Sequence, residues 1–184
     1  MSGYFAAALN EDCVFDLFYG TDYHSHLGTR RAGMAVYGED GFSRAIHNIE
    51  NAPFRTKFTY DLQEMKGYLG IGIISDFDPQ PLLVRSHHGT YAIVTIGKIN
   101  NTDELVKTLF STGSPHFMEM TNGDLNKTEI VSALINQQDN LIDGIKYAQK
   151  SIDGSMSIML LTEKGVYCAR DALGRTPIHI GHKA

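Results

Sequence analysis

The 184-residue sequence contains no tryptophan, only five prolines and only two cysteines. Two cysteines, Cys13 and Cys168, are too few for a framework of disulfide bonds, so we expect free thiols and a cytoplasmic location. The sequence has no run of about eighteen apolar residues, which argues against a transmembrane helix and a membrane partner. Its beginning lacks the basic region and the long apolar stretch of a signal peptide.

Positive charge is also scarce. The sequence has 16 Lys and Arg against 21 Asp and Glu, a formal net charge of −5. A nucleic-acid-binding module usually shows a basic stripe, so we expect no nucleic-acid partner. Hydrophobic residues make up 42% of the chain, which is enough for one compact core. No internal repeat or linker divides the sequence, and we predict a single domain over residues 1–184.

The order of the predicted elements indicates the fold class. Short apolar runs and turn residues predict strands, and apolar residues at helical spacing between capping residues predict helices. We expect strands at 13–19, 32–38, 42–49, 67–75, 80–86, 91–97 and 176–183, a hairpin over 155–171, and helices at 100–113, 126–138 and 140–152. Strands followed by helices and then strands again indicate helices packed on mainly antiparallel sheets, an α+β fold.

Two patterns that could hold a metal or a phosphate are weak. His24 and His26 are two residues apart and would share one face of a strand, as half of a metal site. No group elsewhere has the spacing to complete it, so we expect structural or surface histidines and no metal. The glycines within 67–72 are not followed by the Lys-Ser/Thr pair of a phosphate loop, and we expect no cofactor.

Cys13 leaves two interpretations open. It stands in "NEDCVFDLFYGT", where it opens an apolar run and can be an ordinary packing residue. It can also be a nucleophile that acts after the residues before it are removed. Cys168, inside the predicted hairpin, is expected to be a small buried side chain.

Six stretches, in order, resemble the glutaminase domain of class II glutamine amidotransferases, and the amidophosphoribosyltransferase branch above all. They are "LNEDCVFDLFYGT", "HLGTRRAGMAV", "GIGIISDFDPQPLLV", "YAIVTIGKINNTDEL", "NKTEIVSALI" and "GSMSIMLLTEKGVYCARDALGRTPIHIG". The likeness spans residues 8–182. It implies the N-terminal-nucleophile hydrolase fold, a four-layer αββα sandwich, with hydrolysis of glutamine to glutamate and ammonia for purine nucleotide synthesis.

The resemblance also implies a mechanism. Residues 1–12 would be a propeptide, and Cys13 would become the first residue of the mature chain. Its free α-amine would then accept the thiol proton, because such an amine titrates near pH 8 and is partly neutral at pH 7. The thiolate would attack the amide of glutamine and form a thioester. While Asp12 remains attached, the nitrogen of Cys13 is an amide and cannot act as a base.

The remaining family positions carry unexpected residues. The arginine that binds the α-carboxylate of glutamine corresponds to Ser75, and the aspartate that binds its ammonium corresponds to Lys127. The two oxyanion donors correspond to Ile96 and to the amide of Gly97. Loss of one oxyanion donor costs about 10²–10³ in rate, and an unpaired substrate charge costs roughly 2–5 kcal/mol.

Four charged neighbours are candidates to compensate for these losses. Asp76 or Asp124 would bind the ammonium, and Lys98 or Arg85 would bind the carboxylate. Two functions therefore stay open: a divergent glutaminase, and a catalytically degenerate domain with a regulatory, scaffolding or ligand-binding role.

The resemblance also bears on partners. Relatives carry a phosphoribosyltransferase domain after this one, and no phosphoribosyl pyrophosphate loop occurs before Ala184. We therefore expect either a truncated protein or a stand-alone domain, and a homo-oligomer is an open alternative. The small-molecule partner would be glutamine or a related compound.

Overall fold

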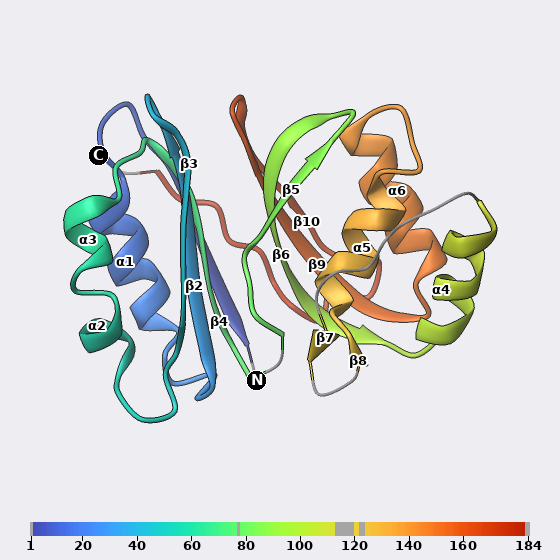
Figure 1. Cartoon of the computed structure of the whole chain (residues 1–184), viewed down its shortest axis with the longest axis horizontal. Coiled ribbons are helices and arrows are strands. Elements are labelled where there is room, and N and C mark those ends of the chain that lie inside the picture. Colours follow the sequence, from blue (N-terminus) through green and yellow to red (C-terminus); the bar gives the residue numbers. More distant parts are fainter. Residues whose placement is uncertain (1, 77, 113–119, 122–123, 183–184) are drawn as a thin grey trace.

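The computed structural model describes residues 2–76, 78–112, 120–121 and 124–182. Figure 1 shows four layers, in which two antiparallel sheets face each other and each sheet carries helices on its outer side. This is the αββα arrangement expected from the resemblance, and the α+β class is confirmed.

The first sheet has the strand order β1-β4-β2-β3. Its strands are β1 Gly3–Ala8, β2 Arg31–Gly38, β3 Gly41–Asn48 and β4 Leu69–Ser75. The turn between β2 and β3 requires a glycine at its end, since Gly41 has a φ of 88°. Strand β4 lies between β1 and β2 and is buried along its whole length.

The second sheet has the order β10-β9-β6-β5. Its strands are β5 Leu82–Ser86, β6 Gly89–Ile99, β9 Gly154–Thr162 and β10 Gly165–Ala169. Hairpin β9–β10 is the one predicted over 155–171, and hairpin β5–β6 joins the strands predicted at 80–86 and 91–97. A short ribbon, β7 Met120–Thr121 with β8 Asp124–Leu125, lies beside this half of the molecule.

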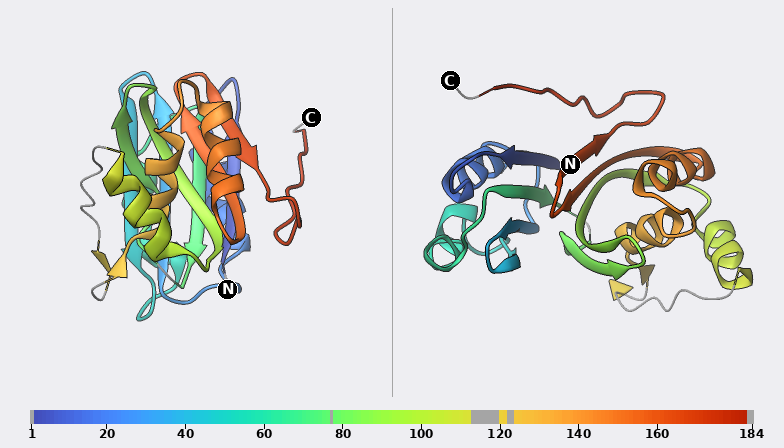
Figure 2. Two further views of the ribbon diagram at one scale, coloured as in Figure 1. Left: turned by 90° about the vertical axis from the view of Figure 1, so that its right-hand side faces the viewer. Right: turned by 90° about the horizontal axis from the view of Figure 1, so that it is seen from above.

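The helices form the two outer layers, as Figure 2 also shows from the side and from above. The first sheet carries α1 Val14–Tyr23, α2 Phe54–Lys57 and α3 Asp61–Glu64. The second sheet carries α4 Thr102–Ser111, α5 Lys127–Ile135 and α6 Leu141–Ser151. These last three are the helices predicted from apolar periodicity.

The glycines of β4 allow α1 to pack closely on the first sheet. A Cβ atom at Gly72 would overlap the Thr21 hydroxyl, and one at Gly70 would overlap the Leu17 side chain. Both helix residues are fully buried. The glycines of this strand therefore allow the close approach of a helix of the same chain.

Two sequence predictions of secondary structure are wrong. Residues 13–19 were expected to form a strand but begin α1, because Val14, Leu17 and Phe18 face the sheet at helical spacing. Residues 176–182 were expected to form a strand but have no regular structure, and most are exposed. A segment with alternating polar and apolar side chains does not form a strand where no neighbouring strand is available to pair with it.

Candidate functional site

Strand β4 ends at the lower edge of the layer between the sheets, where Figure 1 also places the start of the chain. Ile71 and Ile73 pack in the apolar cluster between the two sheets. Side chains two apart on a strand share a face, so Ser75 faces the same layer. Ser75 is 2% exposed and pairs with Arg31 at the start of β2.

The second sheet brings two more predicted residues to this end. Ile96 packs in the cluster between the sheets, and Gly97 follows it near the end of β6. They pair with Ser157 and Met156 of β9. A side chain at Gly97 would overlap the Ser155 carbonyl, which explains the glycine by packing alone.

Lys127 begins α5 at the same end of the molecule. Its backbone N–H donates to Asp78 Oδ2 at 3.0 Å. Asn126 caps the helix, since its side chain accepts a hydrogen bond from the Thr128 amide, and its Nδ2 donates to the Pro79 carbonyl. The segment after β4 is thus held against the start of α5.

A buried polar network fixes that segment to β6 as well. Gln80 Oε1 accepts from the Thr95 amide at 2.7 Å, and Gln80 Nε2 donates to the Thr95 carbonyl at 3.2 Å. The hydroxyl groups of Thr95 and Thr128 are 2.6 Å apart. Gln80 and Thr128 are buried, so these hydrogen bonds are shielded from water.

Asp76 lies at the outer margin of this region. Its Oδ1 accepts a hydrogen bond of 2.6 Å from the Thr29 amide. Burial would raise the pKa of this carboxyl, but the hydrogen bonds that it accepts, among them those from Thr29, outweigh burial and hold the pKa below its usual value. Asp76 is therefore a carboxylate at neutral pH.

The other residues expected to compensate for the missing glutamine contacts lie in different parts of the molecule. Lys98 is exposed on β6 beside Gly97. Arg85 pairs with Thr90 next to the β5–β6 turn, at the other end of the second sheet. The side chain of Asp124 lies outside the described residues.

Cys13 lies at the opposite end of the first sheet. Its backbone N–H donates to the Gly67 carbonyl at 2.7 Å, just before β4 begins, whereas Ser75 ends that strand. Seven residues at about 3.3 Å each separate these ends by roughly 20 Å. The thiol is fully buried, and burial together with the nearby Asp12 carboxylate raises its pKa to about 11.

Comparisons with known proteins identify the family. Residues 69–184 match the family described as "Glutamine amidotransferase domain". The chain belongs to this family. The matched part includes Ser75, Asp76, Ile96, Gly97 and Lys127, and leaves Cys13 outside.

Relatives and solved structures agree with the family. The chain is 29% identical over 175 residues to an amidophosphoribosyltransferase of Methanocaldococcus jannaschii, covering 90% of this chain and 36% of the relative. It is 25% identical to that of Synechocystis, covering 97% and 37%. The chain therefore spans about a third of the length of these relatives.

The fold is that of solved amidotransferases. The Bacillus subtilis glutamine phosphoribosylpyrophosphate amidotransferase, complexed with ADP and GMP, matches with a TM-score of 0.78 at 23% identity, covering 93% of this chain and 37% of that one. A glutamine aminotransferase class-II domain protein from Silicibacter pomeroyi matches with a TM-score of 0.57 at 11% identity, covering 98% and 79%. The N-terminal-nucleophile type of fold is thereby established.

Ser2 is a residue of this amidotransferase domain that the sequence analysis passed over. It directly precedes β1, whose Gly3 pairs with Ile74, so Ser2 lies beside the Ser75 end of β4. The chain start, set aside as a propeptide, carries a six-residue strand hydrogen-bonded to β4. The run "GYFAAA" is a signal for this strand that was available in the sequence.

Two buried hydroxyl groups lie between the sheets, and one of them belongs to β1. Tyr4 and Ser157 face each other between the sheets, and neither hydroxyl has a hydrogen-bond partner of good geometry among the described residues. Burial raises the pKa of Tyr4, and the nearby Ser157 hydroxyl opposes that rise.

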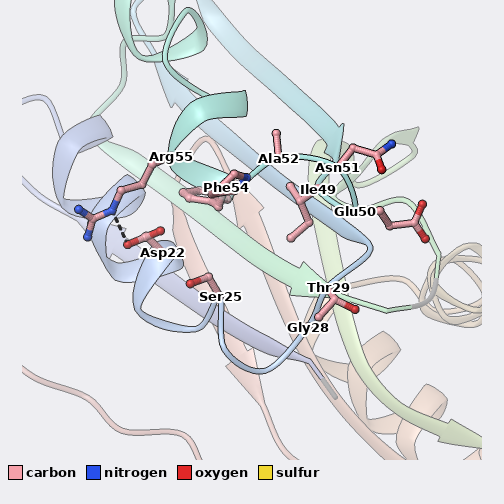
Figure 3. Close-up of a pocket in the computed structure, with 11 residues that line it drawn as sticks. Asp22, Ser25, Gly28, Thr29, Ile49, Glu50, Asn51, Ala52, Phe54 and Arg55 are labelled. Atoms are coloured by element: carbon pink, nitrogen blue, oxygen red, sulfur yellow. Dashed lines mark hydrogen bonds and ion pairs between the residues drawn. The ribbon is translucent and has the colours of Figure 1, made fainter.

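An open groove of about 690 Å³ lies on the outer side of the first sheet, next to the loop that holds Asp76 (Figure 3). Asp22, Ser25, Thr29, Glu50 and Arg55 supply polar groups to it. Its charges are already paired, because Arg55 Nε is 2.8 Å from Asp22 Oδ2 and Glu50 faces Arg30 at 3.7 Å.

His24 lies beside the start of β1, where a Cβ atom at Gly3 would overlap its side chain. Burial, and then the neighbouring His26, lower the pKa of His24. Across the described ranges, no three His, Cys, Asp or Glu side chains gather as metal ligands would.

None of the described helices is long and apolar enough to cross a membrane.

Proposed function

We propose that this chain is one domain, residues 1–184, of an amidophosphoribosyltransferase-like protein, and that it does not release ammonia from glutamine at Cys13. It serves instead as a regulatory, scaffolding or ligand-binding domain. We further propose that it works in the cytoplasm, in purine nucleotide synthesis, beside a phosphoribosyltransferase domain. The names and lengths of its relatives support that setting.

One observation carries the proposal. Cys13 lies roughly 20 Å along β4 from the end where the residues of the family site gather. A nucleophile must lie about 3 Å from the atom that it attacks, and no rotation of a side chain spans that separation. The raised pKa of the Cys13 thiol also argues against catalysis, because a neutral thiol is a poor nucleophile.

The chemistry of the site supports the same conclusion. Ser75 has no charge to bind the α-carboxylate of glutamine, and Ile96 has no donor for an oxyanion. Lys127 would repel the α-ammonium group that an aspartate attracts. These changes remove several charge-assisted hydrogen bonds, each worth about 1.5–3 kcal/mol.

The test is an ammonia-release assay with glutamine, together with calorimetry and the intact mass of the purified protein. We expect an unbroken Asp12–Cys13 bond, no ammonia above background and no heat of glutamine binding at millimolar concentration. Cys13→Ala should behave like the wild type. Ammonia release that disappears in Cys13→Ala, or a chain that begins at Cys13, would contradict the proposal.

The position of Ser2 favours a second candidate function, hydrolysis of an amide by Ser2. Removal of Met1 would leave Ser2 with a hydroxyl and a free α-amine on one residue, the pairing used by N-terminal nucleophiles. Ser2 is also near Asp76 and Ser75. In this case Ser2→Ala abolishes ammonia release while Cys13→Ala preserves it, which separates the two candidates in one experiment.

A further inference from the structure

Arg31 is a half-buried arginine at the start of β2, and its side chain makes no hydrogen bond or ion pair with the described residues. It pairs with Ser75 of β4, and paired residues of antiparallel strands share a face. Further along the same strands, Ala35 and Ile71 are paired in the apolar cluster between the sheets. Because side chains alternate along a strand, Arg31 lies on this inner face as well.

Arg31 is part of a polar row that crosses three neighbouring strands, β1, β4 and β2 (Figure 1). Gly3 pairs with Ile74, so continuing that register sets Ser2 opposite Ser75. Neighbouring strands lie about 4.8 Å apart, and the row is therefore roughly 10 Å wide. A guanidinium binds a carboxylate through two parallel hydrogen bonds, and the two serine hydroxyls can donate further ones.

Two buried hydroxyl groups lie next to this row. Tyr4 is two residues from Ser2 on the inner face of β1, and Ser157 of the second sheet pairs with Ile96. Neither hydroxyl has a hydrogen-bond partner among the described residues. Burying such a group without a partner is unfavourable, so a ligand that bonds to it gains affinity. An uncharged partner, such as an amide, suits these uncharged groups.

The charges near the row limit the kind of ligand. Lys127 begins α5 at this end of the molecule and disfavours a ligand with an ammonium group. Asp76 follows Ser75 and carries a negative charge, and its Oδ1 already accepts a hydrogen bond from the Thr29 amide. This carboxylate weakens the binding of a doubly charged phosphate more than that of an anion with one charge.

We propose that the Ser75 end of the layer between the sheets binds a small monocarboxylate that has a neutral polar group and no ammonium group, and that Arg31 holds its carboxylate. The inference rests on the ligand-binding role proposed above and names the chemical class of the ligand. It is consistent with the expected failure of glutamine to bind, because glutamine carries an ammonium group.

The test is a titration of the isotope-labelled complete chain, followed by its backbone amide signals in NMR spectra. The probe is glutaramate, which is glutamine without its amino group. We expect saturable shifts of the signals around Ser75 at millimolar probe. Glutaramide, in which a neutral amide replaces the carboxylate, should cause no such shifts. Glutamine should bind at least tenfold more weakly than glutaramate.

Variants of Arg31 test which residue holds the carboxylate. Arg31→Gln should weaken glutaramate binding at least tenfold, since the charge-assisted pair is lost. Arg31→Lys keeps the charge without the planar fork and should show a smaller loss. Arg30→Gln is the matched control, because Arg30 is the adjacent residue, is exposed and lies 3.7 Å from Glu50. It should bind like the wild type, and the same spectra show whether each variant is folded.

Three results would overturn this inference: no binding of glutaramate, equal binding of glutaramide, or an Arg31→Gln variant that binds as tightly as Arg30→Gln. Each would leave the absence of ammonia release at Cys13 untouched. Glutamine that binds as tightly as glutaramate would overturn the exclusion of an ammonium group. Ammonia release that disappears in Cys13→Ala would instead contradict the proposed function, so the two failures are distinguishable.

Discussion

At the scale of single residues, the two thiols of this domain differ in their surroundings. Cys13 lies under the first turn of α1, fully buried, whereas Cys168 is exposed on β10. Burial raises the pKa of both thiols, that of Cys13 to about 11. Thiolates are the reactive form, so both the exposure and the pKa of Cys13 protect it from modification.

We expect iodoacetamide at pH 8 to alkylate Cys168 at least ten times faster than Cys13. Peptide mapping by mass spectrometry measures both rates in one sample. Unfolding the protein in urea is the control and should make the two rates similar. Equal rates in the folded protein would show that the Cys13 thiol is accessible.

The same pKa predicts how stability depends on pH. The folded-state value of about 11 lies above the value of 9.0 for a free thiol. The contribution of Cys13 to stability is therefore complete below pH 9 and decreases as the pH rises from 9 to 11. Urea unfolding across this range should show a smaller decrease for Cys13→Ala than for the wild type. If the free energy of unfolding decreased equally with pH in both proteins, a raised pKa of the Cys13 thiol in the folded state would be contradicted.

At the scale of elements, the connection from β4 to β5 joins the two halves of the candidate site. Gln80 fastens it to the backbone of Thr95, and Asn126 and Asp78 fasten it to the start of α5. These groups lie far apart in sequence and meet only because the two sheets face each other. The position of Ser75 and Asp76 depends on this connection.

We predict that Gln80→Leu lowers the free energy of unfolding by about 2–4 kcal/mol. The substitution leaves the buried N–H and C=O groups of Thr95 without partners, and each such loss costs about 1–3 kcal/mol. Urea titration measures the change. Gln63→Leu is the matched control, because Gln63 is exposed on α3 and should change stability by less than about 0.5 kcal/mol.

At the scale of the whole molecule, strand β1 makes the start of the chain a part of the first sheet. Its six residues pair with β4, and Tyr4 and Ala7 are buried. Removing residues 1–12 would take away this strand and leave β4, a strand buried on both faces, at the edge of its sheet. An exposed apolar edge favours aggregation. The loss of residues 1–12 stays a prediction of the resemblance, and the pairing of β1 counts against it.

We expect a variant without residues 2–12 to lose more than about 3 kcal/mol of stability, because Tyr4 and its neighbours no longer bury their apolar surface. Thermal unfolding and light scattering measure the stability and the aggregation. A variant that lacks Met1 alone is the control and should unfold like the full chain. A soluble truncated protein with an unchanged melting temperature would support processing before Cys13.

The sequence alone determined the class of the fold and most of its elements. Helices α4 to α6 and hairpins β5–β6 and β9–β10 follow from local apolar periodicity, which depends only on neighbouring residues. The order of the six family stretches identified the amidotransferase family. The positions Ser75, Ile96, Gly97 and Lys127 could also be named, and the structure brings them to one end of the molecule.

The tertiary structure alone decided where Cys13 lies. An apolar run with aromatic residues fits a strand or a helix, and only the glycines of β4 show that residues 14–23 pack there as a helix. Pairing of β1 with β4 joins residues more than 60 positions apart, a distance that no local pattern contains. That pairing places Ser2 beside the candidate site and leaves Cys13 at the other end, because an extended strand of seven residues separates them.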